Sequence, residues 1–402
     1  LQYRDPADRK SYGTWPRRVP EETVDPNWRE FVGCTLILIR EAFSDRLPKD
    51  LLPDLDEALL RAAEGAAYRD VGPGYSNIAI MSALLMEYVG AEMKRSDLCV
   101  AGKAKAKAVY ERFKEHETFD EFNSPTYYGV DLMGLAMWRH FARSPEIRAW
   151  AEAMEETLWR DMAAVYHAEM RNLAGPYVRA YGMDMMRYYS LAGLWIAIYL
   201  DDPERAPWPD PGGMHSAERA YAPLFMLLNS RPPEDVAEHF TRFVGPREVV
   251  RKFAKSEAHI RLERDIMIGA ARMDRAWEQH HPATVHWLDR RKKNVYWIAL
   301  AGTTPDVEPR LIEDGIAVVR TGDGDEPIVW WVNSPFMEIA GDRWVSDELV
   351  VTVECSPGIE LAAVRSQNST SHHAQYREVI YRVPKHDGTV RPFIRLHLEK
   401  RP

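Results

Sequence analysis

The sequence is poor in cysteine. Its 402 residues hold three cysteines, Cys34, Cys99 and Cys355, which are widely spaced and form no CxxC pair. A disulfide framework needs more thiols, and a cysteine-ligated zinc site needs closer spacing, so the sequence predicts neither.

Long apolar runs and basic stretches are also scarce. The apolar runs Cys34–Ile39 and Leu191–Leu200 end at charged residues and fall short of the roughly 20 residues that span a bilayer. The formal net charge is −9, and the basic run Arg290–Lys293 is short enough to be a solvated turn. We therefore expect a soluble protein that binds neither membranes nor nucleic acid. The compartment and the oligomeric state stay open.

Motifs for cofactors, metals and activated nucleophiles are missing as well. There is no GxSxG motif. In Gly322–Asp325 the two glycines alternate with aspartates, whose negative charge would repel a phosphate. The histidines of two segments lack the acidic or cysteine partners of a metal site and are interpreted as loop packing and as a surface turn: His280, His281 and His286, and His372 and His373. We expect neither a metal nor a cofactor.

What the sequence does contain is typical of a globular protein with more than one domain. Hydrophobic residues make up 46% and charged residues 28% of the chain, whose length exceeds one typical core. Residues 1–27 include Pro6, Pro16, Pro20 and Pro26, which forbid regular structure. We expect an extended arm there.

Apolar residues recur at helical spacing from Trp28 onward. The predicted helices are Trp28–Phe43, Leu51–Ala67, Asn77–Met93, Ala101–His116, Val130–Ala142, Pro145–Tyr166, Met183–Leu200, Ala217–Asn229 and Pro233–Phe243. Ser144 before Pro145 is typical of a helix start. The pattern predicts helical hairpins over residues 28–255.

Alternating and β-branched residues replace this spacing farther along the chain. The predicted strands are Ile266–Ala270, Ala283–Leu288, Asn294–Leu300, Gly315–Arg320, Ile328–Val332, Leu349–Glu354, Ile359–Val364, Glu378–Val383 and Phe393–Leu398. Turn signals separate them, so we expect an antiparallel β-sandwich over residues 256–402.

Three loop-to-helix junctions resemble one another at intervals of about 50 residues, the length of a helical hairpin with its loops. They are Gly74–Asn77, Asn123–Gly129 and Gly175–Gly182. Because each leads into a helix, we expect the junctions to line one rim. The side chains of the first two that would contact a ligand there are Tyr75, Asn77, Tyr127 and Tyr128.

Polar and aromatic side chains are densest in the second junction. Asn123, Tyr127, Tyr128 and Asp131 flank Pro125, and a loop that restarts as a helix presents such groups to a ligand. The same residues also fit a helix N-cap with aromatic packing. Both interpretations stay open.

The third junction lies between a histidine and an aspartate. His167 offers a proton acceptor, Tyr177 and Tyr181 offer phenols, and Asp184 follows them. Arg179 between the two tyrosines supplies a fixed cation. A lone histidine on a helix also fits a core or surface residue whose hydrogen bonds are satisfied.

β-Elimination of a uronate needs such groups. The C6 carboxylate must be neutralised, the C5 proton removed and the departing glycosidic oxygen protonated. Asn123 and Arg179 suit the first task, and histidine or tyrosine the other two. No metal is required.

These residues, on inner loops of helical hairpins that precede a β-sandwich, resemble the toroidal polysaccharide lyases, the group of heparinase II/III-like, chondroitin and alginate lyases. The resemblance implies an (α/α) toroid followed by a C-terminal antiparallel β-sandwich, and elimination on a uronate-containing glycan. The residues it assigns to the reaction are Asn123, His167, Tyr177 or Tyr181, and Arg179. The chain departs from the group in having Ser124 after Asn123, where a second Asn or a His is common, and in having room for about five hairpins.

Three other functions fit the same sequence. A glycoside hydrolase would use paired carboxylates among Glu121, Asp131 and Asp184. A cyclase or dehydratase of an apolar small molecule would use an aromatic helical cavity, for which 16 Met, 13 Trp and 18 Tyr provide the side chains. A binding protein without catalysis would need only the rim.

Overall fold

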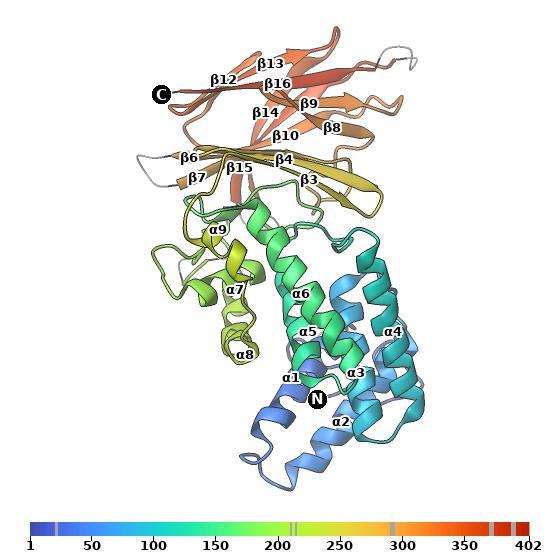
Figure 1. Ribbon diagram of the computed structural model, residues 1–402. Helices are drawn as coiled ribbons and strands as arrows, with labels where there is room; N and C mark the ends of the chain where they lie inside the picture. The colour runs from blue at the N-terminus through green and yellow to red at the C-terminus, as the bar shows by residue number, and fades with distance from the viewer. Residues whose placement is uncertain are drawn as a thin grey trace. The chain divides into compact units, whose positions relative to one another are not determined.

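The computed structural model describes residues 1–20, 23–209, 211–213, 215–289, 294–369, 374–386 and 391–401. The basic run Arg290–Lys293 and the pair His372 and His373 lie outside these residues. The described residues form helices α1 to α9 and then strands β3 to β16 (Figure 1). A short pair, β1 (Tyr166–His167) and β2 (Asn172–Leu173), comes between α6 and α7. This order confirms the predicted fold class of helical hairpins followed by a C-terminal antiparallel β-sandwich.

The chain forms two compact units. The helical unit comprises Leu1–Glu121, Val130–Leu158 and Tyr221–Arg231, and the mixed unit comprises Phe122–Gly129, Trp159–Ala220 and Pro232–Pro402. The second and third junctions of the sequence therefore belong to the mixed unit, together with the sheets.

The helices follow the predicted apolar spacing in most cases. Their bounds are α1 Trp28–Phe43, α2 Leu51–Arg69, α3 Ser76–Glu92, α4 Ser96–Lys114, α5 Tyr127–Phe141, α6 Pro145–Val165, α7 Leu191–Leu200, α8 Ala222–Leu228 and α9 Glu238–Thr241. The predicted helix Met183–Leu200 is wrong over its first part, because α7 begins only after Ser190, whose Oγ accepts a 3.0 Å hydrogen bond from the Gly193 amide as an N-cap. The last two predicted helices are also shorter, since 3₁₀ turns precede α8 and α9.

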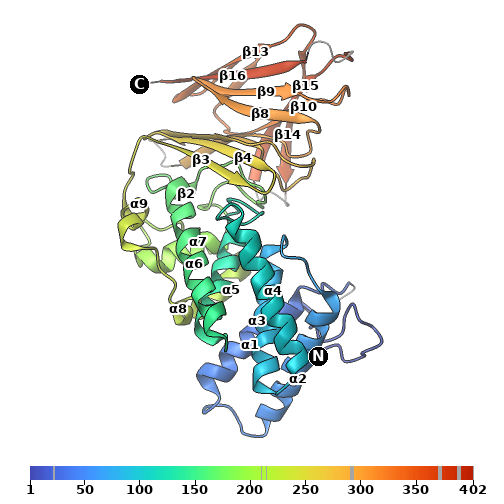
Figure 2. The ribbon, with the colours of Figure 1, turned by 45° about the vertical axis from the view of Figure 1, so that its right-hand side comes forward.

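Helix α3 is the centre of the helical unit and is buried on nearly every side. It forms a hairpin with α4, and the two lie side by side in Figures 1 and 2. Glycines allow this close approach: a Cβ at Gly90 would lie 2.2 Å from the Cys99 amide nitrogen, and one at Gly102 would lie 2.4 Å from the Glu87 amide nitrogen.

The N-terminal arm is held by backbone contacts within the helical unit. The Gln2 side chain donates from Nε2 to the Ala58 carbonyl of α2 at 2.9 Å. The buried guanidinium of Arg29 donates to the carbonyls of Tyr12 and Lys10, each at 2.9 Å. These side-chain bonds to the backbone, rather than regular structure, hold the proline-rich arm on the helices.

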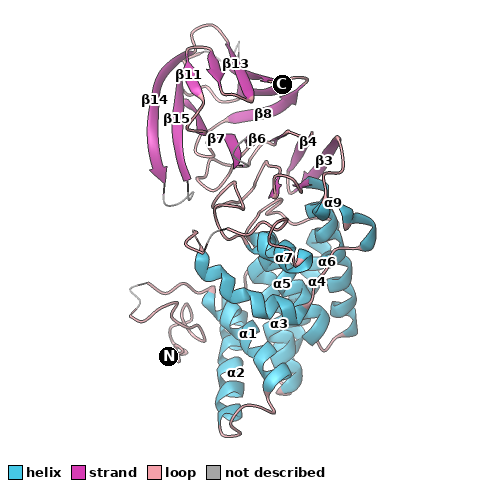
Figure 3. Cartoon of the chain, turned by 90° about the vertical axis from the view of Figure 1, so that its left-hand side faces the viewer, coloured by secondary structure: helices cyan, strands magenta, loops and turns pink. Residues whose placement is uncertain are grey.

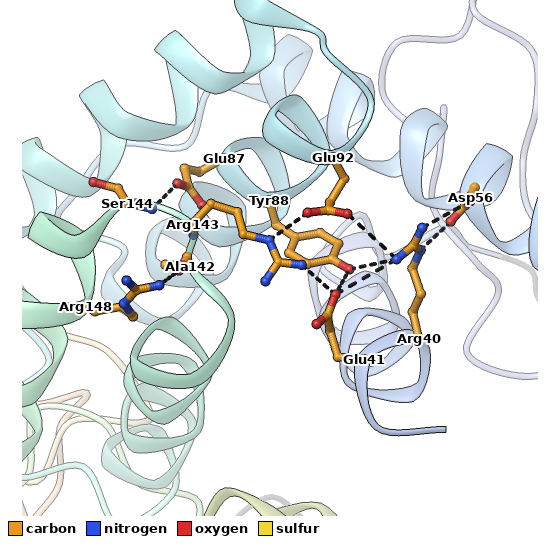
Figure 4. Close-up of polar contacts among 10 residues, drawn as sticks. All are labelled: Arg40, Glu41, Asp56, Glu87, Tyr88, Glu92, Ala142, Arg143, Ser144 and Arg148. Carbon is orange, nitrogen blue, oxygen red and sulfur yellow. Dashed lines mark hydrogen bonds and ion pairs between the residues drawn. The ribbon is translucent and has the colours of Figure 1, made fainter. Parts of the chain in front are cut away.

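A polar network joins α1, α3 and the connection between α5 and α6 (Figure 4). Arg143 pairs with Glu41 and with Glu92 at 2.7 Å each, and its guanidinium lies 4.8 Å from the Tyr88 ring centroid. The buried carboxylate of Glu87 accepts from the backbone amides of Arg143 at 3.0 Å and Ser144 at 2.7 Å. Glu87 thus satisfies amides directly before α6, where helical hydrogen bonds cannot reach.

Replacing Glu87 with Ala should lower the free energy of unfolding by about 2 kcal/mol, because two amides lose a buried acceptor. Urea denaturation followed by circular dichroism measures the loss. Glu87→Gln, which keeps one acceptor oxygen, should lose less. Equal midpoints for the parent and Glu87→Ala would show that water replaces the carboxylate without cost.

The sandwich consists of two antiparallel sheets. Among the described residues, one sheet has eight strands in the order β14-β15-β10-β7-β6-β5-β4-β3, and the other has six in the order β11-β12-β13-β16-β9-β8. The bounds are β3 Arg247–Phe253, β4 Ser256–Leu262, β5 Ile266–Ala270, β6 Ala283–Asp289, β7 Asn294–Leu300, β8 Val307–Ile312, β9 Gly315–Arg320, β10 Ile328–Asn333, β11 Glu338–Ala340, β12 Arg343–Val345, β13 Leu349–Cys355, β14 Glu360–Ser369, β15 Ala374–Arg382 and β16 Phe393–Lys400. Figure 3 shows the long β14–β15 pair. Side chains of both sheets, among them Trp330 and Trp344, share one buried core.

The strands predicted from the sequence are all present, but the first sheet begins earlier than expected. Strand β3 precedes residue 255 and is an edge strand whose alternate side chains, Glu248, Val250 and Lys252, are exposed. Such a strand has little apolar character in its sequence. The sequence also did not indicate β4, β8, β11 and β12, of which β8 and β11 are edge strands as well.

Candidate functional site

The second and third junctions lie side by side in the mixed unit. The Val178 amide donates to the Phe122 carbonyl at 3.2 Å. The buried Asn123, with a φ of 52°, donates from Nδ2 to the carbonyls of Ala174 at 2.5 Å and Pro176 at 2.9 Å. Asn123 therefore joins the two loops through their backbones, and its Oδ1 has no partner among the described residues.

A half-buried group of rings and a guanidinium forms where these junctions meet. We call it the Arg179 cluster, and its members are Tyr127, Arg179, Tyr181, His215 and Trp277. The Arg179 guanidinium carbon lies 3.8 Å from the Tyr127 ring centroid and 5.4 Å from that of Trp277. The hydroxyls of Tyr127 and Tyr181 are 2.8 Å apart. His215 stacks on Tyr181 with ring centroids 5.1 Å apart.

Hydrogen bonds with Ser124 and Gln279 hold this cluster in place. Ser124 caps the start of α5, where its Oγ accepts from the Tyr127 amide at 3.1 Å and donates to the Arg179 carbonyl. Gln279 accepts from Arg179 Nε at 2.9 Å through its side chain and from the Ala180 amide at 2.9 Å through its carbonyl. The cation and both phenols are thereby held in place before any ligand binds.

Tyr177 lies apart from this cluster, in a fully buried position against β6. Its hydroxyl donates to the Leu173 carbonyl and lies 3.5 Å from His286 Nε2, and its backbone pairs with that of His281. Burial raises the pKa of Tyr177 well above its usual value and lowers that of His286 to about 4. The histidine-rich segment that the sequence analysis interpreted as loop packing thus supplies the neighbours of a candidate catalytic tyrosine.

His167 is also buried, and both of its ring nitrogens bind backbone. Nδ1 accepts from the Met170 amide at 3.2 Å, while Nε2 lies 3.0 Å from the Glu263 carbonyl and 3.1 Å from that of Arg264. Burial lowers its pKa to about 4, so the ring is neutral at pH 7. These contacts are those of a histidine that positions a turn.

Asp184 borders two pockets of the mixed unit. Its Oδ1 accepts from the Met186 amide at 2.8 Å, and its carboxylate lies 3.6 Å from Arg187. Burial raises its pKa to about 6 despite that cation. One pocket has a volume of about 880 Å³ and the other of about 640 Å³, and Arg187 lines both as well.

The other candidate residues make local contacts. Tyr128 is buried in the mixed unit, with its ring centroid 6.4 Å from that of Phe122. In the helical unit, the Tyr75 hydroxyl accepts from Asn27 at 3.2 Å, and Asn77 donates to Glu121 at 2.8 Å. The proposed common rim of the three junctions stays a prediction, since the first junction lies in the other unit.

Asp131, the remaining candidate, is fully buried in the helical unit. It accepts from the Ser76 hydroxyl at 3.3 Å. Burial, with a contribution from the charge of Glu121, raises its pKa well above the usual value. Burial thus disfavours the charged form of this α5 carboxyl.

The described residues contain no group of three or more His, Cys, Asp or Glu side chains arranged to hold a metal ion. None of their helices is both long and apolar enough to cross a bilayer.

The chain is similar to one protein family and to several solved structures. Residues 3–230 match the family described as "Domain of unknown function (DUF8769)". A crystal structure of heparinase III is 8% identical, with a TM-score of 0.45, and the match covers 96% of this chain and 71% of that one. Heparan sulfate lyase HepC from Pedobacter heparinus is 8% identical, with a TM-score of 0.47 and coverages of 94% and 68%. No curated protein matches the sequence.

Proposed function

The chain belongs to the DUF8769 family, whose description assigns no activity, and we propose that it binds a uronate-containing glycan and cleaves it by β-elimination. One observation carries the proposal. A guanidinium lies 3.8 Å from the ring centroid of a tyrosine whose hydroxyl shares a 2.8 Å hydrogen bond with a second tyrosine. The cation suits a carboxylate, and the phenol pair suits proton transfer.

In this mechanism Arg179 binds the C6 carboxylate and makes the C5 proton acidic. Tyr181, as the phenolate of the pair, takes that proton, and the electrons of the C5–H bond form the C4=C5 double bond. The C4–O4 bond breaks, and the leaving oxygen takes a proton from Tyr127. A proton then passes from Tyr181 to Tyr127 along their hydrogen bond and restores the pair.

The remaining candidates act on position rather than on protons in this proposal. The Asn123 side chain joins the two junctions by donating to backbone carbonyls of the third junction and its preceding residue, and the Tyr177 hydroxyl donates to the Leu173 carbonyl. His167 has both nitrogens bound to backbone. We therefore assign proton transfer to Tyr181 and Tyr127, and positioning to Asn123, His167 and Tyr177.

Arg179→Lys should weaken the binding of a uronate oligosaccharide by about tenfold, because lysine keeps the charge but loses the planar fork and the stacking on Tyr127. Isothermal titration calorimetry measures the affinity. Arg310→Lys is the matched control, since Arg310 is an exposed arginine that pairs with Glu308. Equal affinities of Arg179→Lys and the parent would mean that Arg179 only packs between rings.

The reaction itself is tested by incubating the protein with hyaluronan, chondroitin, heparan sulfate and alginate. Elimination produces an unsaturated uronate that absorbs in the ultraviolet, together with new reducing ends. Both signals should rise together on at least one polymer. Reducing ends without absorbance would reject elimination, and neither signal on any polymer would reject cleavage of these uronates.

A second function, glycoside hydrolysis, has one observation in its favour. The smaller pocket is lined by three carboxyl groups, Glu169, Asp184 and Glu204, and the pKa of Asp184 is raised to about 6. Glycosidases pair a carboxylic acid of raised pKa with a second carboxyl group, and Asp184 is the pocket carboxyl whose pKa is raised. Loss of reducing ends in Asp184→Asn, without any ultraviolet product from the parent, would favour this reaction.

A further inference from the structure

The larger pocket has an unusual combination of side chains. Besides Asp184 and two arginines, its lining includes five amide side chains, those of Asn294, Asn333, Gln367, Asn368 and Gln375. Five aromatic rings line it as well, namely Tyr188, Tyr296, Trp297, Phe336 and Tyr376. Planar amides bind hydroxyl groups as both donors and acceptors, and rings stack on the C–H faces of sugars, so this lining suits a carbohydrate.

Phe336 is the most exposed ring of this pocket. Its side chain is 52% exposed, although exposing a large apolar side chain to water is unfavourable. The turn that carries it is fixed: Arg377 donates to the carbonyls of Ser334 and Met337 at 2.6 Å each. The Tyr296 ring packs edge-on to Phe336, with centroids 6.2 Å apart. The ring is thus held in place while much of it stays open to a ligand.

The pocket is connected with the Arg179 cluster through rings. Tyr188 lines the pocket and packs at a steep angle to the His215 ring, with centroids 6.5 Å apart, and His215 stacks on Tyr181. Gly182 and Met183, which directly follow Tyr181, also line the pocket. The pocket and the Arg179 cluster are therefore neighbours, with Tyr188 in contact with both.

We propose that this pocket is a binding subsite for a hydroxyl-bearing sugar unit of the glycan, with Phe336 as its stacking surface. The inference rests on the proposed function for the kind of glycan. It adds a recognition site at a distance from the bond that is cleaved. Such a site makes affinity depend on the length of the oligosaccharide.

The test uses Phe336→Ala in a Tyr181→Phe background, so that ligands are not consumed. The probes are disaccharides and hexasaccharides of hyaluronan, chondroitin, heparan sulfate and alginate, and calorimetry measures their affinity. For at least one glycan, the Tyr181→Phe protein should bind the hexasaccharide more tightly than the disaccharide. Phe336→Ala should weaken hexasaccharide binding by about tenfold and leave disaccharide binding nearly unchanged.

Tyr68→Ala is the matched control, because Tyr68 is an exposed ring, 47% accessible, in the helical unit. It should change neither affinity. Equal hexasaccharide affinity with and without Phe336, or no binding of any probe, overturns the subsite. If the parent cleaves none of the polymers while hexasaccharide affinity still depends on Phe336, the subsite stands and the elimination fails. If the parent cleaves a polymer and Phe336→Ala leaves hexasaccharide affinity unchanged, the elimination stands and the subsite fails.

Discussion

Tyr181→Phe is expected to lower the turnover of a cleaved glycan by about 10²–10⁴-fold, the usual cost of removing a positioned acid or base. The substitution removes the hydroxyl that lies 2.8 Å from that of Tyr127 and leaves the ring that stacks on His215. The fold and the affinity for substrate should therefore stay close to those of the parent. Initial rates at saturating substrate, with circular dichroism of the variant, give the comparison.

Tyr177→Phe provides the matched control for this experiment. Its hydroxyl is buried and bonds to the Leu173 carbonyl, so its loss should reduce stability by about 1 kcal/mol and affect turnover much less. The reverse result, with Tyr177→Phe inactive and Tyr181→Phe active, would move the chemistry to the buried group around His286. Full turnover in both variants would remove tyrosine from the proton transfer.

Acid should destabilise the mixed unit through two of its buried histidines, His167 and His286. The pKa values of His167 and His286 are lowered to about 4, below the ordinary 6.5 that they regain on unfolding. The unfolded chain then binds more protons, so stability is complete above about pH 6.5 and is lost as the pH falls toward 4. The loss reaches up to about 3 kcal/mol for each histidine. Urea denaturation at a series of pH values measures it.

Asp184 opposes this trend and must be separated from it. Its folded pKa of about 6 lies above the ordinary 3.8, so its contribution is complete below about pH 3.8 and is lost as the pH rises through 6. Asp184→Asn should therefore steepen the acid destabilisation. His167→Gln should flatten it, at the cost of lower stability at pH 7. A parent whose unfolding free energy is constant from pH 7 to 4.5, with an unchanged slope in both variants, would contradict these assignments.

Much of the fold could be predicted because local pattern and burial agree. Helix α1 has the predicted bounds, Trp28–Phe43, since its apolar residues form one face. The prediction failed where apolar residues are buried without a helix, as Met183 and Met185 are in the loop before Ser190. It also failed for the edge strand β3, whose exposed positions weaken the apolar signal.

The candidate site was less predictable, because the environment of each side chain is set by distant segments. Tyr127, Arg179 and Tyr181 were identified as polar and aromatic groups in matching junctions, and the structure brings them together. Nothing near His167 in sequence shows that the carbonyls of Glu263 and Arg264 will bind its ring. Trp277 and Gln279 likewise reach Arg179 from a loop about a hundred residues away and carry no motif.

The mass of the products tests the central proposal most directly. A uronate polymer that the protein degrades should be digested to completion and its oligosaccharides analysed by mass spectrometry, with Tyr181→Phe alongside. Elimination predicts a fragment with an unsaturated end that lacks the elements of water, formed by the parent and nearly absent with Tyr181→Phe. Fragments that have all gained water would contradict elimination, and unsaturated fragments formed equally by both proteins would contradict the role of Tyr181.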